Sequence, residues 1–243
     1  MKIIINGACG RMGREVERLV LESESHELAA KVDKIAADIG CYSNINDFTA
    51  QADMIIDFSN HLGTSELLEY AVKTKTPVVV ATTGHTVEEL RLIDEAAKSI
   101  PVFHSANMSL GVALLCDLAV KTAAVMPDAD IEIVETHHNR KLDAPSGTAL
   151  MIANAIKSVR ENAAFKLGRA GNAKREKSEI GIHAVRRGNI VGIHEVHVST
   201  DSQTITLKHE AHSRALFAEG AISAAEFIFN KPAGLYTMNN IVK

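Results

Sequence analysis

Residues 3–13 have the sequence Ile3-Ile4-Ile5-Asn6-Gly7-Ala8-Cys9-Gly10-Arg11-Met12-Gly13. An apolar strand that runs into a glycine-rich turn and then a helix is the context that a dinucleotide-binding site requires. Gly7 allows the tight turn, Gly10 lets a phosphate approach the backbone, and Gly13 lets helix and strand pack closely. The helix start then presents N–H groups and a positive dipole end to a pyrophosphate. The spacing is GxxGxxG, a variant of the usual fingerprint, so a turn without a ligand is the alternative.

Asp33 strengthens the dinucleotide interpretation. It lies twenty residues after Gly13, at the end of the second predicted strand. A carboxylate there can accept hydrogen bonds from the ribose hydroxyls of adenosine, whereas Lys34 beside it could meet a 2′-phosphate. A solvated acid at a strand end is the alternative for Asp33. Together the turn and Asp33 predict a nicotinamide dinucleotide site.

Residues 1 to about 108 alternate strand-like and helix-like segments, which predicts βαβ units and a parallel sheet. The run Val78-Val79-Val80 is continuously apolar, as expected for a strand covered by helices on both faces. The fold class is therefore α/β, with a doubly wound, Rossmann-like domain. The expected strands are Ile3–Asn6, Leu28–Asp33, Met54–Phe58, Pro77–Ala81 and Pro101–His104, and the helices are Arg11–Ser23, Leu62–Thr74 and Val87–Ser99.

The pattern then changes to that of a second, smaller α+β domain. In Gln203–Glu210, residues Ile205, Leu207 and His209 share one face, and this period of two indicates a sheet with one drier face. Asp201-Ser202 and Gly188-Asn189 are predicted hairpin turns. The final helix, Ala215–Phe229, is expected to pack on the first domain. The other expected elements are the helices Leu110–Met126 and Ser146–Arg160 and the strands Ile131–Thr136, Ile180–Arg186 and Ile190–Ser199.

The composition is that of an ordinary globular protein and excludes several classes. Of 243 residues, 46% are apolar and 23% are charged, which excludes a disordered or collagen-like chain. No apolar run approaches the roughly 18 residues of a membrane-spanning helix. Lys plus Arg is 26 against 30 for Asp plus Glu, and aromatic residues are 4%, so we expect no nucleic-acid partner. Three cysteines without a CxxC pair favour a reducing, cytoplasmic location.

Two polar loops follow predicted parallel strands of the first domain, where open α/β sheets bind ligands. They are Ala81-Thr82-Thr83-Gly84 and Ser105-Ala106-Asn107-Met108. Thr and Asn side chains there can hydrogen-bond a nicotinamide or its ribose, but ordinary loop chemistry explains them equally well.

The stretch from His137 to Thr148 has the most informative chemistry. Two adjacent histidines leave a predicted strand, Lys141 follows, and Ser146-Gly147-Thr148 opens a helix after a proline. Backbone N–H groups beside two hydroxyls form an anion cradle for a carboxylate, and lysine and histidine supply positive charge and transferable protons. The alternative is a Ser helix cap beside solvated side chains.

The sequence predicts no metal site. Adjacent strand residues such as His137 and His138 point to opposite faces, and no Cys or His partner lies at zinc-like spacing. The later strand histidines, such as His194 and His209, stay unassigned.

These residues together resemble the 4-hydroxy-tetrahydrodipicolinate reductase family, long called dihydrodipicolinate reductase, of the diaminopimelate route to lysine. The block His-His-x-x-Lys-x-Asp-Ala-Pro-Ser-Gly-Thr-Ala at 137–149 is highly specific to that family, whereas the glycine turn is not. The resemblance covers the whole chain and includes Gly7–Gly13, Thr82–Gly84, Ala106-Asn107, Ile180-Gly181 and Gly188–His194.

The resemblance implies an oxidoreductase that uses NADH or NADPH to reduce 4-hydroxy-tetrahydrodipicolinate, via its dehydrated form, to tetrahydrodipicolinate. It implies that His137 and Lys141 donate protons and that His138 and Ser146-Gly147-Thr148 hold the carboxylates of a dicarboxylate cyclic imine. The implied cofactor-binding residues are Gly7, Ala8, Cys9, Gly10, Arg11, Met12, Asp33, Lys34, Ala81, Thr82, Thr83, Ser105, Ala106, Asn107 and Met108.

The resemblance also implies a homotetramer and a division of labour between the two domains. A dinucleotide-binding domain would comprise residues 1–108 and 214–243, and a substrate-binding and oligomerisation domain would comprise 109–213. Lys34 stands where arginine is common, which leaves the choice between NADH and NADPH open. Two alternatives are another Rossmann reductase of a small amino or imino acid and a non-catalytic redox sensor that only binds the dinucleotide.

Overall fold

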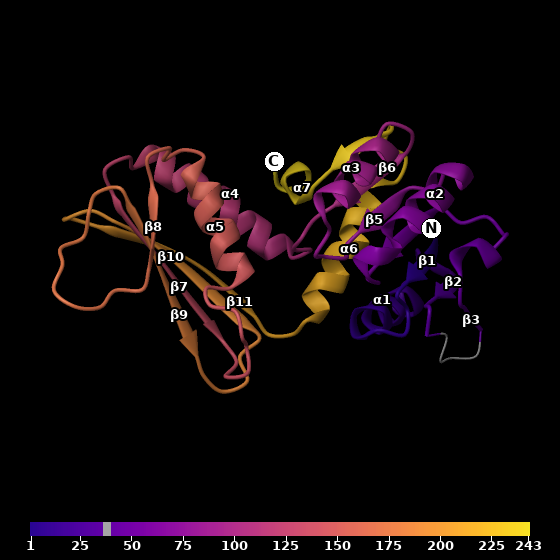
Figure 1. Cartoon of the computed structure of the whole chain (residues 1–243), viewed down its shortest axis with the longest axis horizontal. Helices are drawn as coiled ribbons and strands as arrows, with labels where there is room; N and C mark the ends of the chain where they lie inside the picture. Colours follow the sequence, from indigo (N-terminus) through magenta and orange to yellow (C-terminus); the bar gives the residue numbers. More distant parts are fainter. Residues whose placement is uncertain (36–39) are drawn as a thin grey trace. The chain divides into compact units, whose positions relative to one another are not determined.

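The computed structural model describes residues 1–35 and 40–243, which fold into two compact units. The first unit comprises residues 1–109 and 215–243, and the second comprises residues 110–214. In Figure 1, helix α6 (Ala215–Ile228) and the yellow segment that follows it belong to the first unit, together with the indigo to magenta elements of residues 1–109.

The first unit is built on a sheet with the strand order β12-β6-β5-β4-β1-β2-β3, and all its described pairs are parallel. The direction of winding reverses between β1 and β4, as in doubly wound nucleotide-binding folds. This confirms the predicted fold class. The strands are β1 Lys2–Asn6, β2 Glu27–Val32, β3 Cys41–Tyr42, β4 Met54–Asp57, β5 Val78–Val80, β6 Pro101–His104 and β12 Gly234–Tyr236.

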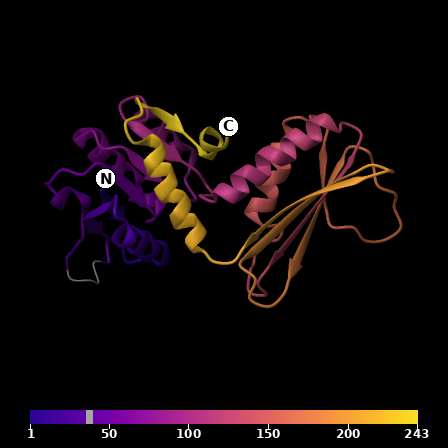
Figure 2. The same ribbon diagram turned by 180° about the vertical axis from the view of Figure 1, so that it is seen from behind.

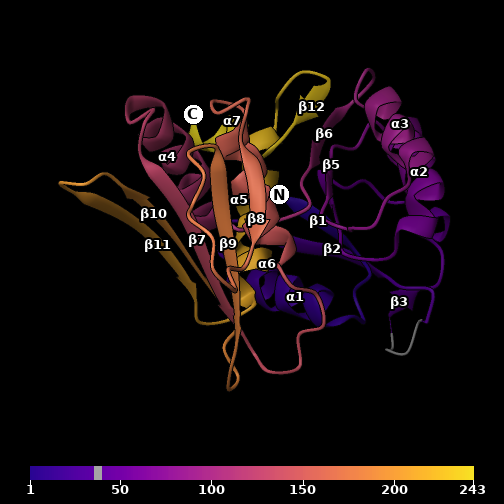
Figure 3. The same ribbon diagram turned by 60° about the vertical axis from the view of Figure 1, so that its left-hand side comes forward.

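Helices cover both faces of this sheet (Figure 3). Helices α2 and α3 pack together, and their Leu67 and Ile93 share a core with Ile4 and Ile55. Helix α6 packs on α1 and contacts β4, β5 and β6. Because both faces are covered, Val78–Val80 is fully buried. The remaining helices of this unit are α1 Arg11–Glu22, α2 Thr64–Thr74, α3 Val87–Ala96 and α7 Met238–Val242, with 3₁₀ turns η1 Ile45–Asp47 and η2 His61–Gly63.

The second unit is a mixed sheet with the order β11-β10-β7-β9-β8. Strands β7, β9 and β8 are parallel to one another, whereas β10 pairs antiparallel with β7 and β11. Its elements are α4 Leu110–Val125, β7 Asp130–His137, α5 Gly147–Lys157, β8 Ala164–Leu167, β9 Glu179–Arg186, β10 Gly192–Ser199 and β11 Thr204–Ala211.

Helices α4 and α5 pack together beside this sheet (Figure 2). They share a core with Ile131, Ile133, Val196 and Val198. In the register, Val196 lies opposite Leu207 and Val198 opposite Ile205, so the drier face predicted for residues 203–210 is the face toward the helices.

The predicted hairpin at Asp201-Ser202 is confirmed, because β10 and β11 are antiparallel neighbours. The hairpin predicted at Gly188-Asn189 is wrong. Gly188 does form a turn with φ of +51°, but the strands that it joins, β9 and β10, are separated by β7. In the described part of the chain, no helix combines the length and apolar character needed to cross a membrane.

Candidate active site

The glycine turn is held between three elements of the first unit. Gly7 has a φ of +81°, and an added Cβ would lie 2.6 Å from the carbonyl oxygen of Phe58. At Gly13 an added Cβ would overlap the backbone of Gly7 and Ala8. The N–H groups of Gly7 and Ala8 donate to the carbonyl oxygen of Val32, at 2.8 and 3.1 Å. Gly7 and Gly13 therefore have the steric roles predicted for them.

The start of α1 fits the phosphates of a dinucleotide. Gly10 is the N-cap, is exposed, and supplies no side-chain acceptor for the first N–H groups of the helix. Such a helix start has N–H groups and a positive dipole end available for an anion.

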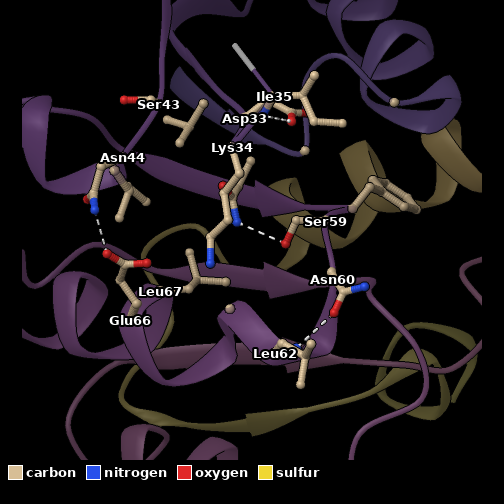
Figure 4. Close-up of a pocket in the computed structure, with 17 residues that line it drawn as sticks. Asp33, Lys34, Ile35, Ser43, Asn44, Ser59, Asn60, Leu62, Glu66 and Leu67 are labelled. Carbon is tan, nitrogen blue, oxygen red and sulfur yellow. Dashed lines mark hydrogen bonds between the residues drawn. The ribbon is translucent and has the colours of Figure 1, made fainter.

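Asp33 lies beside this turn, at the end of β2. Its Oδ2 atom accepts a hydrogen bond from the Cys9 N–H at 3.0 Å, and its Oδ1 atom accepts one from the Ile35 N–H at 3.0 Å. Both Asp33 and the exposed Lys34 line a pocket of about 370 Å³ that also includes Gly7 and Gly10 (Figure 4). The pocket therefore lies beside the glycine turn, where doubly wound folds bind the adenosine part of a dinucleotide.

The other predicted cofactor residues follow β5 and β6 at the same carboxyl edge of the parallel sheet. Ala81 and Thr82 are buried there, whereas Thr83 and Ala106 are exposed. Ser105 and Asn107 form a tight turn in which the Ser105 hydroxyl donates to the Asn107 carbonyl at 2.7 Å. The predicted residue Met108 is only 2% exposed, which leaves its side chain in the core of the first unit.

Asp57, at the end of β4, is a buried carboxyl group that the sequence analysis missed. Its Oδ1 atom accepts hydrogen bonds from the Asn6 amide at 2.8 Å and the Ser59 hydroxyl at 2.5 Å. Burial raises the pKa of Asp57, against the effect of these hydrogen bonds. Through these hydrogen bonds the Asp57 carboxyl group connects the end of β1 to the loop after β4, next to the glycine turn.

The histidine–lysine stretch (residues 137–148) lies in the second unit. The buried carboxylate of Glu135 is at the centre of the hydrogen bonds around it. His137 places Nδ1 2.5 Å from the Glu135 carboxylate, and the Arg186 guanidinium donates to both carboxylate oxygens at 2.8 Å. The Ser146 N–H donates to the same carboxylate at 3.0 Å. Burial opposes ionisation of Glu135, but hydrogen bonds from His137, Arg186 and Ser146 outweigh it and lower its pKa to about 2.

The protonation of Glu135 decides which nitrogen of His137 carries a hydrogen. An ionised carboxylate only accepts hydrogen bonds, so Nδ1 of His137 must donate. The Nε2 atom is then the ring nitrogen that Glu135 does not contact. An added Cβ at Gly192 would lie 3.1 Å from Nε2, so the glycine keeps space open on that side of the ring.

Positive charge gathers around His138 and Lys141. His138 is half-buried, and its Nδ1 has no hydrogen-bond partner among the described residues. Burial, followed by the charges of Arg140 and Arg214, lowers the pKa of His138. The Lys141 ammonium pairs with Asp143 at 2.8 Å and keeps 22% of its side chain exposed. This cluster suits a small dianion.

Ser146 caps α5, as its position before the helix predicts. Its hydroxyl accepts a hydrogen bond from the Ala149 N–H at 3.2 Å and also lies 3.2 Å from Nε2 of His194. Gly147 at the first position of the helix is exposed, and Thr148 is half-buried. At the start of α5, where the sequence predicts an anion cradle, Gly147 therefore lies at the surface and Ser146 is buried.

Sequence reasoning missed Glu135, Arg186 and His194 as parts of this arrangement. Glu135 and His137 are two residues apart on one strand, so they face the same side, and this parity was a signal that could have been used. Arg186 pairs across β7 and β9, in register with His137, and no local pattern predicts that pairing. Among the described residues no group of three or more His, Cys, Asp or Glu side chains could hold a metal ion.

Comparison with known proteins finds the same family for both parts of the chain. Residues 1–108 match the family model "Dihydrodipicolinate reductase, N-terminus", and residues 111–242 match the model for its C-terminus. The 4-hydroxy-tetrahydrodipicolinate reductases of Caldanaerobacter subterraneus subsp. tengcongensis and Clostridium novyi are 47% and 44% identical over 247 residues. Each alignment covers 100% of this chain and 98% of the relative.

A solved structure agrees with these matches. The dipicolinate-bound dihydrodipicolinate reductase from Paenisporosarcina sp. TG-14 superposes with a TM-score of 0.84 at 26% identity, covering 99% of both chains. A diaminopimelate dehydrogenase from C. glutamicum shares the fold, with a TM-score of 0.61 at 12% identity over 98% of this chain and 93% of that one.

Proposed function

The chain belongs to the dihydrodipicolinate reductase family, and we propose that His137 and Lys141 supply the protons for the reaction of that family. The chain is an oxidoreductase that reduces 4-hydroxy-tetrahydrodipicolinate in lysine biosynthesis with a nicotinamide cofactor. The observation that carries this function is the full-length match together with the cluster around Glu135, His137 and Lys141.

A bound nicotinamide cofactor supplies the hydride, and the residues of this chain bind, orient and protonate the substrate. The substrate, in its dehydrated form, is an unsaturated six-membered ring with an imine and two carboxylates. As hydride adds, negative charge moves toward the ring nitrogen and must be met by a proton. Either His137, from Nε2 while Glu135 holds Nδ1, or Lys141, from its ammonium, donates this proton.

The carboxylates of the substrate bind to the cationic cluster and the start of α5. His138, Ser146, Gly147 and Thr148 are the proposed ligands. The exposed Gly147 at the helix start and the nearby charges of Arg140 and Arg214 support this assignment. Because these groups hold both carboxylates at once, they orient the ring for attack, and this positioning lowers the barrier.

The first unit is the proposed dinucleotide-binding domain, and the second is the proposed substrate-binding and oligomerisation domain. We propose that the chain uses both NADH and NADPH. Asp33 favours a free 2′-hydroxyl and repels a 2′-phosphate, whereas the exposed Lys34 in the same pocket attracts the phosphate as a point charge. The two effects nearly offset each other.

We also propose a homotetramer built through the sheet of the second unit. The face opposite α4 and α5 carries Val134, Val185 and Ile193 among charged side chains, and Val185 is 39% exposed. Static light scattering tests this proposal, with an expected mass of about four times the 26.2 kDa chain. A mass of a single chain would contradict it.

Substrate profiling tests the reaction. Cofactor oxidation is measured with freshly generated 4-hydroxy-tetrahydrodipicolinate and with a panel of small amino and imino acids. The expected result is oxidation with the first substrate and little with the panel. Activity confined to another imino acid would contradict the assignment of substrate.

A further inference from the structure

Two cysteine thiols meet beside the proposed cofactor pocket. Cys9 belongs to the glycine turn and Cys41 to β3, yet their Sγ atoms lie only 3.9 Å apart. Both residues are partly exposed, so a small oxidant can reach them. The third cysteine, Cys116, is buried in α4 of the second unit.

The backbones of both cysteines are tied to the segment that carries Asp33. The Cys9 N–H donates to the Asp33 carboxylate at 3.0 Å. Cys41 pairs with Lys31 across β2 and β3, and the Asp33 N–H donates to the Tyr42 carbonyl at 2.9 Å. The segments that carry the two thiols therefore both contact the residue that is proposed to bind the adenosine ribose.

We propose that Cys9 and Cys41 are a modification site, where hydrogen peroxide produces a reversible disulfide that weakens binding of the nicotinamide cofactor. The effect on the cofactor rests on the proposed cofactor site, whereas formation of the disulfide does not.

The oxidation balances with peroxide as the oxidant. The sulfur of Cys9 attacks one peroxide oxygen, the O–O bond breaks, and a sulfenic acid and one water form. The sulfur of Cys41 then attacks the sulfenic sulfur, the S–S bond forms, and a second water leaves. The two thiols lose two protons and two electrons in total, and a dithiol reductant reverses the change.

Cys9 is the first nucleophile in this scheme. Burial and the neighbouring Cys9 raise the pKa of Cys41 to about 11, so the Cys41 thiol stays protonated at neutral pH. Burial also raises the pKa of Cys116 to about 11, and its side chain is only 7% exposed, which makes it a matched unreactive control.

Disulfide formation must rotate the Cys9 and Cys41 side chains or shift the glycine turn and β3 that carry them. An S–S bond is about 2.05 Å long, so sulfur atoms now 3.9 Å apart must approach by about 1.9 Å. The Cys9 N–H donates to Asp33, so we propose that the disulfide draws the turn away from the carboxylate that is proposed to bind the ribose. Coupling between two such sites is commonly 5- to 150-fold in affinity, and we expect roughly a tenfold rise in the Kd for NADH. By linkage, bound NADH should oppose disulfide formation by the same factor.

The test compares the full-length wild type with Cys41→Ser and Cys116→Ser, each before and after treatment with hydrogen peroxide. Peptide mass spectrometry detects the cross-link, and fluorescence titration gives the Kd for NADH. We expect a Cys9–Cys41 cross-linked peptide and a roughly tenfold higher Kd in the wild type and in Cys116→Ser, both reversed by dithiothreitol. In Cys41→Ser the Kd should not change with peroxide.

Three results would overturn the proposal. One is the absence of the Cys9–Cys41 peptide after peroxide treatment. Another is a fully formed disulfide with an unchanged Kd. The third is an equal loss of affinity in Cys41→Ser, which would assign the effect to oxidation of Cys9 alone. Failure of the reduced wild type to bind NADH would instead contradict the proposed cofactor site, and the mass of the cross-linked peptide would still report on the disulfide.

Discussion

Glu135 determines how His137 can act. Its carboxylate is fully buried, stays ionised, and accepts the Nδ1 hydrogen of His137, so the Nε2 atom is the one available for the proposed proton transfer. Arg186 balances the buried negative charge with two hydrogen bonds. The arrangement resembles other acid–base sites in which a third group orients the histidine.

Lys141→Ala should lower turnover by roughly two to four orders of magnitude, the range expected for loss of a general acid. Affinity for NADH should hardly change, because Lys141 belongs to the second unit. Steady-state kinetics and NADH titration check both expectations. Lys121→Ala is the matched control, since Lys121 also pairs with an aspartate, Asp117 at 2.6 Å, but lies on the surface of α4. Near-normal turnover of Lys141→Ala would remove the lysine from the mechanism.

Asp33 and Lys34 should have opposite effects on the two cofactors. Wild type should prefer NADH by at most about tenfold, or ~1.4 kcal/mol. Lys34→Ala should weaken NADPH and spare NADH, whereas Asp33→Ala should weaken NADH more, and added salt should weaken NADPH more than NADH. Titration of both cofactors against the three proteins checks this. Equal losses for both cofactors in each variant would mean that neither residue contacts the ribose.

At the scale of elements, Ser146, the N-cap of α5, connects the stability of the helix to the proposed substrate binding. Ser146→Ala removes the helix cap and should lower the free energy of unfolding by about 1 kcal/mol. Combined with Thr148→Val, it should raise the Michaelis constant for substrate more than it lowers turnover, because these groups bind the ground state. Denaturant unfolding and kinetics measure the two effects.

The matched control is Thr86→Ala, which removes the cap of α3 in the first unit. It should cost a similar amount of stability and leave the Michaelis constant for substrate unchanged. A collapse of turnover with unchanged substrate affinity in the Ser146/Thr148 variant would mean that the cradle does not hold the carboxylates.

Elements with a clear apolar pattern were predictable from the sequence, whereas a two-residue strand and non-local pairings were not. The strand predicted at Pro101–His104 has the same bounds in the structure, and the helix predicted at Leu110–Met126 ends one residue earlier, at Val125. The two-residue strand β3 has no periodicity to detect, so it was missed. The false hairpin at Gly188-Asn189 arose because turn residues do not reveal that β7 enters between β9 and β10. Glu135 could have been placed on the same face as His137, because the two residues are two apart on one strand. Its partner Arg186 could not be identified, because it lies on another strand.

At the scale of the whole molecule, stability should fall in acid for two reasons. The folded-state pKa of His194 is about 4 against an ordinary 6.5, because burial and then His137 disfavour its charged form. Below pH 6.5 the His194 imidazole therefore binds a proton in the unfolded chain but not in the folded chain, which lowers the free energy of unfolding. The pKa of Glu135 is about 2 against 4.5, so its stabilisation is complete above 4.5 and is lost as the pH falls toward 2.

Denaturant unfolding from about pH 7 to about pH 3 measures this effect. The free energy of unfolding should decrease from about pH 6.5 downward and more steeply below about 4.5. Glu135→Gln should be less stable at neutral pH and should lose less below pH 4.5 than wild type. A flat profile for the wild type would contradict the pKa directions of both residues.

The most direct test of the central claim is the stoichiometry of the reaction itself. Wild-type chain is mixed with NADH or NADPH and freshly generated 4-hydroxy-tetrahydrodipicolinate, and both oxidised cofactor and tetrahydrodipicolinate are quantified. We predict substrate-dependent oxidation with each cofactor, one tetrahydrodipicolinate per cofactor oxidised, and loss of turnover in His137→Gln with cofactor binding intact. Tight cofactor binding without any substrate-dependent oxidation would contradict the account and indicate a dinucleotide-binding protein that does not catalyse the reduction.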